Sequence, residues 1–221
     1  MTSKLNKEQE AQVFKLVTTY WPHYLGLRQP YNIEGLFFWS RDLLKQLIKK
    51  QFEIEIADRV VVNYLTRWGI KPLNRVKTKL EQCDSDIQCW WKTHGEEVLA
   101  RSKSENAKIF WMGEIGLIGL EKVESSRNKR LTNVPVIENQ GRMHWLTFQG
   151  EFKDEKQVMF LNSLKRQSRT KIFLIRKTRT HFNKWLVKHW LKENKDYMEI
   201  FPPDVDIKKI KKTNQHPASI K

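Results

Sequence analysis

Residues 107–117 read AKIFWMGEIGL, and residues 171–176 read KIFLIR. Each segment holds four consecutive apolar residues with polar or small residues beside them. Short continuous apolar runs of this kind are typical of strands that are buried on both faces of a sheet. The two segments therefore predict central strands at residues 108–112 and 171–175. In a parallel sheet a functional site is expected just beyond the carboxyl ends of such strands.

Further strands and helices alternate around these two segments. Asn139 and Gly141 suit a tight turn that leads into a strand. The other predicted elements are a strand at residues 143–148, a helix at residues 154–166, a helix at residues 183–194 and a short strand at residues 198–201. Strands that alternate with helices imply an α/β sheet with parallel central strands.

The first part of the chain predicts helices instead. Residues 7–20 place apolar side chains on one helical face, and Pro22 follows them. Ser40 is placed to cap a second helix that carries an apolar stripe. A third helix is expected from about residue 57 to residue 67, before Gly69. Three short helices connected in this way have the layout of a helix-turn-helix, whose last helix enters the major groove of DNA.

The outward face of the third helix offers side chains that suit base edges. Arg59 and Asn63 lie one turn apart, and Arg suits guanine whereas Asn suits adenine. The residues predicted to contact DNA, through base edges or phosphates, are Ser40, Arg41, Lys45, Arg59, Asn63, Thr66, Arg67, Lys71, Arg75 and Lys77. The alternative is a plain three-helix bundle with a solvated basic face.

The net charge of the chain favours a DNA-binding helix-turn-helix over a plain three-helix bundle. The 221 residues carry a formal net charge of +16, from 41 Lys and Arg against 25 Asp and Glu. Such an excess favours a polyanionic partner through phosphate neutralisation, and nucleic acid is the leading class. A basic surface that is merely solvated would have the same composition. Hydrophobic residues make up 39% of the chain, which suffices for a sizeable core.

Membrane insertion and cysteine chemistry are not expected. No stretch approaches the roughly 18 consecutive apolar residues of a membrane-spanning helix, and the first residues are polar, unlike a signal peptide. We therefore expect a cytoplasmic protein with no membrane partner. Cys83 and Cys89 are the only cysteines, too few for a disulfide framework or a zinc site, and we expect both thiols to be at least half-buried.

A long polar helix is predicted between the two parts, at about residues 84–106, with a break near Gly95. Several tryptophans stand in predicted helices: Trp90, Trp91, Trp185 and Trp190. They are either platforms for base stacking or part of the core. At helical spacing, the core is the expected place.

Several phrases of the chain resemble one known family. They are WSR at residues 39–41, YLTRWGIKP at 64–72, EQ at 81–82, AKIFW at 107–111, NQG at 139–141, KIFLI at 171–175 and WL at 190–191. Over about residues 5–203 the chain is similar to the mariner-like transposases of bacterial insertion sequences. The resemblance implies an α+β protein that combines a DNA-binding part with a transposase domain.

The resemblance, together with the basic composition of the last residues, divides the chain into four parts. The first is an N-terminal all-α winged helix-turn-helix at residues 1–78, and the second is a helical connector at residues 79–106. An incomplete ribonuclease-H-like α/β transposase domain follows at residues 107–207, and a basic tail at residues 208–221. The region 121–130 stands where the family has a strand and hairpin, so the sheet is expected to lack an edge strand.

The chemistry of the family rests on three carboxylates that hold two divalent cations. Here the position of the first acid is Gly113, and only its neighbour Glu114 is acidic. The position of the second acid falls at Lys177 and Thr178, and of the third phrase only the proline pair 202–203 remains. We therefore expect Glu114 to be a vestige, with no metal site and no cofactor unless magnesium supports a surviving activity.

Three functions remain open on these grounds. The first is a transposase-related DNA-binding protein that is defective in DNA cleavage and strand transfer. The second is an active transposase with unconventional metal ligands, such as Glu114, Asp204 and Asp206. The third is a regulator that pairs with an intact transposase and inhibits it. The implied partners are double-stranded DNA at the terminal inverted repeats of an insertion sequence, and a second protomer in a homodimer or heterodimer. The implied location is the bacterial nucleoid.

Overall fold

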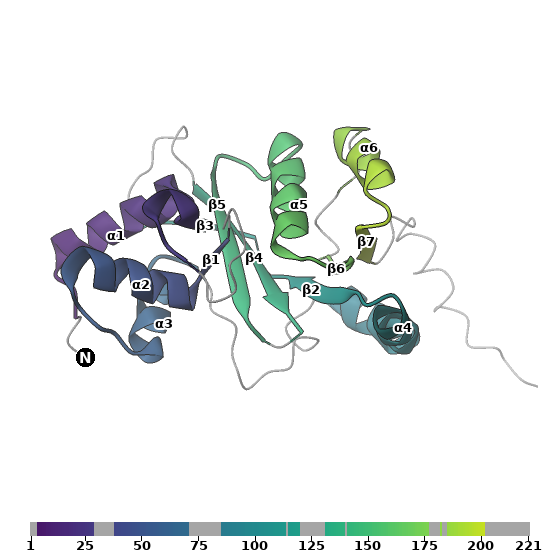
Figure 1. Cartoon of the computed structure of the whole chain (residues 1–221), viewed down its shortest axis with the longest axis horizontal. Helices are drawn as coiled ribbons and strands as arrows, with labels where there is room; N and C mark the ends of the chain where they lie inside the picture. Colours follow the sequence, from purple (N-terminus) through teal and green to yellow (C-terminus); the bar gives the residue numbers. More distant parts are fainter. Residues whose placement is uncertain are drawn as a thin grey trace, which may run out of the picture.

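The computed structural model describes residues 4–28, 38–70, 85–113, 115–119, 131–139, 141–176, 182 and 185–201. Within these residues, three helices stand at one end of a mixed sheet, and three further helices cover the two faces of the sheet (Figure 1). The combination of a helical first part with an α/β second part is confirmed at this level.

The first helix, α1 (Lys7–Thr19), is capped at its amino terminus by Asn6 and buries one apolar face. The Asn6 side chain accepts a hydrogen bond from the Gln9 N–H at 2.8 Å, and the Gln9 side chain accepts one from the Asn6 N–H at 3.0 Å. This reciprocal capping box satisfies two donors that the first turn would otherwise leave open. A single 3-10 turn, η1 (Pro22–Leu25), follows.

The next two helices, α2 (Arg41–Phe52) and α3 (Asp58–Arg67), pack against α1. Ser40 caps α2, because its Oγ accepts a hydrogen bond from the Leu43 N–H at 3.3 Å. The stripe that α2 and α3 bury consists of Leu43, Leu44, Leu47, Ile48, Val61, Tyr64 and Leu65. All three predicted helices of this part are therefore confirmed.

The strands are β1 (Trp39–Ser40), β2 (Lys108–Met112), β3 (Gly116–Ile118), β4 (Leu131–Glu138), β5 (Met143–Gln149), β6 (Ile172–Ile175) and β7 (Met198–Phe201). Their order across the sheet is β1-β5-β4-β2-β6-β7, with β3 paired to β4 off this path. β2, β6 and β7 run parallel, whereas β4 and β5 are antiparallel to their neighbours. The predicted parallel pairing of the two central apolar runs is confirmed.

Two strands that the sequence did not predict lie beside the centre of the sheet. β4 pairs with β2 on one side and with β5 on the other, and β3 pairs with β4. Pro135 stands within β4, and proline argues against an inner strand because it has no N–H for the ladder. β3 and β4 flank residues 121–130, where the strand and hairpin were expected to be missing; residues 121–130 lie outside the described residues, so that expectation stays a prediction.

The two faces of the sheet bury alternate residues of each strand. One face packs on α5 (Glu155–Gln167) and α6 (Trp185–Glu193), and the other packs on α4 (Ser85–Ser104), which lies on the opposite side in Figure 1. The helix predictions at residues 154–166 and 183–194 are confirmed to within two residues. Among the described residues, no helix combines the length and the hydropathy needed to cross a bilayer.

The predicted break of the connecting helix at Gly95 is wrong, because α4 runs without interruption through that residue. Gly95 is buried, and a Cβ there would lie 2.7 Å from the indole of Trp91. The missing side chain lets Trp91 fold along the helix and reach Trp111 on β2, at 4.6 Å between ring centroids. Glycine serves here as a close-packing position.

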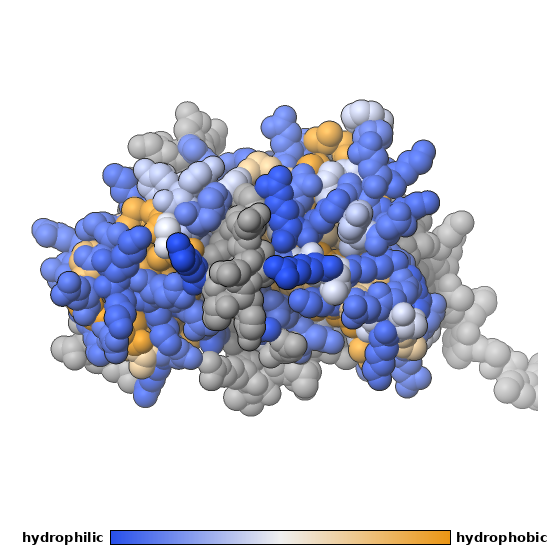
Figure 2. Space-filling model, in the orientation of Figure 1, coloured by the Kyte–Doolittle hydropathy of each residue, from blue (hydrophilic) through white to orange (hydrophobic). Residues whose placement is uncertain are grey.

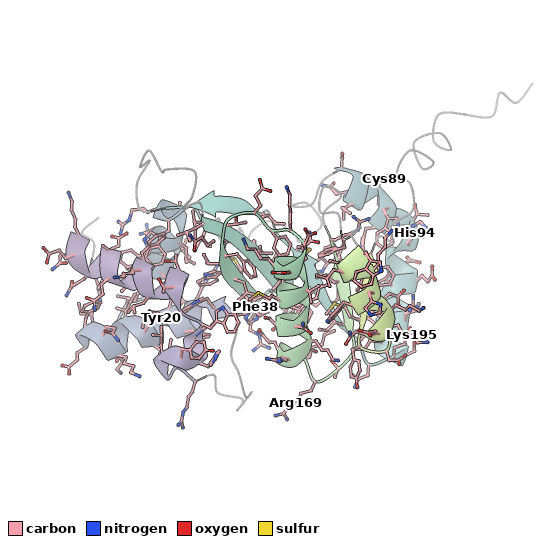
Figure 3. The ribbon with its side chains drawn as sticks, turned by 90° about the horizontal axis from the view of Figure 1, so that it is seen from above. Tyr20, Phe38, Cys89, His94, Arg169 and Lys195 are labelled. Carbon is pink, nitrogen blue, oxygen red and sulfur yellow. The ribbon has the colours of Figure 1, made fainter. Side chains whose placement is uncertain are left out.

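The helical first part joins the sheet through β1. Trp39 pairs with Trp145 on β5, and both side chains belong to the same buried cluster as α1, α2 and α3. Phe38 lies near the middle of the molecule in Figure 3. Its ring contacts the ring of Phe160 on α5, with 5.8 Å between the ring centroids. The expectation of an all-α first part is therefore wrong at residues 39–40. The predicted domain boundaries stay a prediction.

Candidate nucleic-acid interface

The outward face of α3 carries the pair of side chains predicted to read bases. Arg59 and Asn63 are both exposed, whereas Val61 and Tyr64 on the opposite face are fully buried. Thr66 is exposed one turn further on, and its hydroxyl donates to the carbonyl of Val62 at 2.8 Å. Arg59 and Asn63 are thus presented together on a helix whose position is fixed by its buried face.

Arg67 is placed differently from this pair. Its guanidinium donates to both carboxylate oxygens of Glu10 on α1, with the Nε–Oε1 distance at 3.1 Å, and it lies 4.8 Å from the centre of the Tyr64 ring. The indole of Trp68 donates to the same Oε1 at 3.1 Å. Glu10 therefore ties α1 to the end of α3, and Arg67 serves this link. The sequence did not indicate it, because Glu10 and Arg67 lie far apart in the chain.

Other predicted contact residues also have local roles. Lys45 donates to Asp58 at 2.9 Å, and this hydrogen bond raises the pKa of Lys45 while it joins α2 to the first turn of α3. Ser40 is buried and its Oγ is used as the cap of α2, and Arg41 beside it is half-buried. Three further predicted contacts lie outside the described residues: Lys71, Arg75 and Lys77.

The surface around these helices is largely polar. The face seen in Figure 2 is dominated by hydrophilic side chains over the helices on both sides of the sheet, with apolar residues in scattered patches. A polar surface on a chain with a net charge of +16 suits electrostatic attraction to phosphate better than it suits a large apolar partner interface. Cys89, expected to be at least half-buried, is exposed on α4 (Figure 3).

At the carboxyl end of β2, Gly113 packs against the ring of Pro135, which leaves no space for a side chain. Gly113 is buried, and its N–H donates to the carbonyl of Pro135 on β4 at 2.8 Å. A Cβ at position 113 would lie 2.7 Å from Cγ and 3.2 Å from Cβ of Pro135. Real Cβ atoms essentially never approach another heavy atom at 2.7 Å, so any side chain there requires the proline to move. The proline ring is bonded to the backbone of an inner strand, which resists that movement.

The neighbouring strand end carries a cation. Arg176, directly after β6, is 3% exposed, and its N–H donates to the carbonyl of Phe201 at 2.7 Å. It lines a cavity of about 300 Å³ together with Lys195 and Glu199. The other residues of the expected acidic site lie outside the described residues: Glu114, Lys177, Thr178, Asp204 and Asp206.

The two described residues at these strand ends, Gly113 and Arg176, supply no carboxylate for a magnesium ion. Magnesium prefers several carboxylate or water oxygens in octahedral arrangement. Gly113 has no side chain and packs against the ring of Pro135, and Arg176 carries a positive charge. Within the described part of the chain, no three His, Cys, Asp or Glu side chains gather where they could hold a metal ion.

A polar network that the sequence did not indicate lies on the α5 face of the sheet. Glu138 forms an ion pair with Arg142, with 3.3 Å between Oε2 and Nε. Its other oxygen lies 2.8 Å from Nε2 of His144, whose Nδ1 lies 3.2 Å from the Gln167 side chain. Burial disfavours ionisation of Glu138, but the hydrogen bond with His144 and the charges of His144 and Arg142 outweigh it and lower the pKa of the carboxyl. Both ring nitrogens of His144 have partners, which favours a structural role.

Comparisons with known proteins give limited similarity. No protein-family model and no curated protein matches this sequence. Among solved structures, the chain is similar to a Mos1 transposase paired-end complex with left transposon end, at a TM-score of 0.34. It is also similar to a pre-cleavage Mos1 transpososome and to a Mos1 strand transfer complex, each at 0.31. Identity is 12% in each case, over 92% of this chain, which spans about three fifths of the length of the matched chains.

Proposed function

We propose that this chain is a transposase-related DNA-binding protein that does not cleave DNA or transfer strands. The observation that carries the proposal is the exposed pair Arg59 and Asn63, one turn apart on a helix whose opposite face is fully buried. A helix held in this way presents its polar side chains in a constant arrangement, as base readout requires. The net charge of +16 supplies the attraction to phosphates.

The loss of cleavage is inferred from the end of β2. Cleavage in this class needs carboxylates that hold two divalent cations on either side of a phosphodiester. Gly113 cannot supply one, and its packing against Pro135 leaves no room for a side chain. An inactive protein of this kind would act by occupying DNA.

The finer features of the proposal follow from the family resemblance. We infer that α2 and α3 belong to a winged helix-turn-helix and that the sheet is a ribonuclease-H-like domain. The duplex it reads is then a terminal inverted repeat of a bacterial insertion sequence, bound in the nucleoid by a homodimer or by a heterodimer with an intact transposase. No magnesium is required for this binding.

The test begins with selection of bound duplexes from a random DNA pool. The best duplex and a scrambled control are then titrated at several salt concentrations. Arg59→Ala and Asn63→Ala should each weaken binding to the selected duplex by about 5- to 150-fold and should change the scrambled control far less. Arg169→Ala removes the same charge as Arg59→Ala from an exposed residue far from α3 (Figure 3), and serves as the matched control.

Equal binding by wild type, Arg59→Ala and Asn63→Ala would contradict readout by α3. A second arm incubates the selected duplex with magnesium or manganese and measures nicking, and none is expected. Nicking that disappears in Glu114→Ala would instead support an active transposase with unconventional ligands. Inhibition of an intact relative, with co-purification of the two proteins, would place the DNA-binding role in a regulator.

A further inference from the structure

One face of α6 is exposed and carries an unusual set of side chains. Trp185, Lys188, His189 and Lys192 stand at spacings of three and four residues, so they share one stripe of the helix. All are exposed, whereas Val187 and Trp190 on the other side are buried against the sheet. The stripe therefore lies on the solvent side of α6, whose position is fixed by its buried face.

Trp185 contributes little to the core, contrary to the interpretation of the tryptophans as core residues. It is 75% exposed, which is the largest exposure among the large hydrophobic side chains of the described residues. Trp190, by contrast, is 8% exposed, and its indole donates to Asn162 on α5 at 2.9 Å. Trp190 joins α5 to α6, and Trp185 is left with no comparable structural role.

The exposed indole is held as a flat platform. The rings of Trp185 and His189 stack at 5.2 Å between centroids with an interplanar angle of 6°. His189 lies 3.2 Å from a carboxylate oxygen of Glu193, which restrains the imidazole from its other side. A planar ring that is already oriented loses less conformational freedom when a second planar group stacks on it.

Cations surround this platform. Lys188 and Lys192 stand on the same stripe, and in the described part of the chain neither has an ion pair. Lys195 is exposed just beyond the end of α6 (Figure 3). An aromatic platform with free ammonium groups beside it is complementary to an unpaired base and its flanking phosphates. A paired base offers no free face, because its neighbours in the duplex cover it.

We propose that the stripe of Trp185, Lys188, His189 and Lys192 binds single-stranded DNA, with one unpaired base stacked on Trp185 and the lysines on adjacent phosphates. This surface is separate from α3 and reads no sequence. The inference goes beyond the duplex recognition proposed above, and it does not depend on Arg59 or Asn63. Together the two surfaces would hold a duplex site and a frayed strand on one molecule.

The experiment measures binding of the full-length protein to short fluorescein-labelled oligo(dA) and oligo(dT) by fluorescence anisotropy. Trp185→Ala should weaken binding about 5- to 150-fold, because stacking on one aromatic ring contributes about 1–3 kcal/mol per base. Trp185→Phe should recover part of the loss. Tyr24→Ala changes an aromatic residue that is 70% exposed on η1 and should leave binding unchanged.

Salt dependence separates stacking from charge. Lys188→Gln and Lys192→Gln should each lower the slope of log K against log salt by about 0.7, the value for one phosphate contact on a single strand. Trp185→Ala should leave this slope unchanged while it lowers affinity at every salt concentration. The thermal midpoint of Trp185→Ala should equal that of wild type, since the side chain is exposed.

Wild-type affinity of Trp185→Ala for both oligonucleotides would overturn the proposal. So would a change of oligomeric state in Trp185→Ala with no change in oligonucleotide binding, because the platform would then be a protein contact. Loss of duplex binding in Arg59→Ala is scored separately. The α6 surface and the α3 surface can therefore fail independently.

Discussion

A Cβ atom at position 113 would lie 2.7 Å from Cγ of Pro135. The two residues are also joined by a hydrogen bond of 2.8 Å from the Gly113 N–H to the Pro135 carbonyl, so they are held together from the backbone as well. The end of β2 is thus closed by packing. A side chain at position 113 would therefore require the opposite strand to change as well.

Gly113→Ala should therefore destabilise the protein. Overpacking of a buried position costs about 1–3 kcal/mol, which corresponds to roughly 2–12 °C in the thermal midpoint of a chain of this size. Thermal unfolding followed by circular dichroism measures the change. Gly116→Ala is the matched control, because a Cβ at Gly116 meets nothing within 4 Å. Equal thermal midpoints for Gly113→Ala and Gly116→Ala would show that Pro135 can move aside without a cost in stability.

The contact with Pro135 can be isolated by a double mutant. Pro135→Ala removes the ring that the new side chain of Gly113→Ala would meet. The double mutant should therefore lose less free energy of unfolding than the two single mutants lose together, with a coupling energy of about 0.5–3 kcal/mol. Gly113→Asp should be less stable than Gly113→Ala, because it also buries a carboxylate. Neither Gly113→Asp nor its combination with Pro135→Ala should nick DNA, since a single acid does not complete the site.

Gly95→Ala should destabilise the protein although alanine favours helices. In a solvent-exposed helix this change contributes about 1 kcal/mol of stability. Here the new Cβ would lie 2.7 Å from the indole of Trp91 and would push that ring from its contact with Trp111. Urea unfolding should give a lower midpoint than wild type. A higher midpoint would mean that the Trp91 ring can move at no cost.

Glu10→Ala should lower the free energy of unfolding by about 1–2 kcal/mol, because it removes the acceptor of both Arg67 and Trp68. Binding to a selected duplex should persist in this variant under conditions where it remains folded. Glu55→Gln disrupts an exposed ion pair with Lys49 and should leave the midpoint unchanged. A loss of DNA affinity in Glu10→Ala without loss of stability would show that α1 orients a DNA contact directly.

The network at Glu138 predicts a pH dependence of stability. The pKa of Glu138 is lowered in the folded protein, so its contribution is present above the unfolded pKa of about 4.3 and is lost as the pH falls through the folded value. Glu138→Gln should be less stable than wild type at pH 7, and the two should converge at lower pH. Urea unfolding at several pH values measures this. Glu97→Gln, at an exposed position on α4, should run parallel to wild type.

Much of the secondary structure could be predicted because it is encoded locally. Continuous apolar runs predicted β2 and β6, and Ser40 followed by an apolar stripe predicted α2. β1 and β4 could not be predicted in this way. β1 has only two residues and exists because Trp39 pairs with Trp145, and β4 contains a proline whose place depends on the two strands beside it.

The same limit applies to the candidate sites. The sequence placed glycine where an acid is expected and placed Arg59 and Asn63 one turn apart, since both follow from position along an element. It could not show that Arg67 is bound by Glu10, because that contact joins residues far apart in the chain. Nor did the sequence show that Trp190 is buried and Trp185 exposed, because that depends on which side of α6 packs against the sheet.

The amino-acid sequence by itself determined the basic charge, the main helices and strands, and the absence of an acid at position 113. These depend on composition and on short-range periodicity, which a linear chain carries in full. Only the tertiary structure decided that Pro135 packs against position 113 and that the face of α6 with Trp185 remains in solvent. Both depend on which distant segments pack together, and packing is a property of the folded chain.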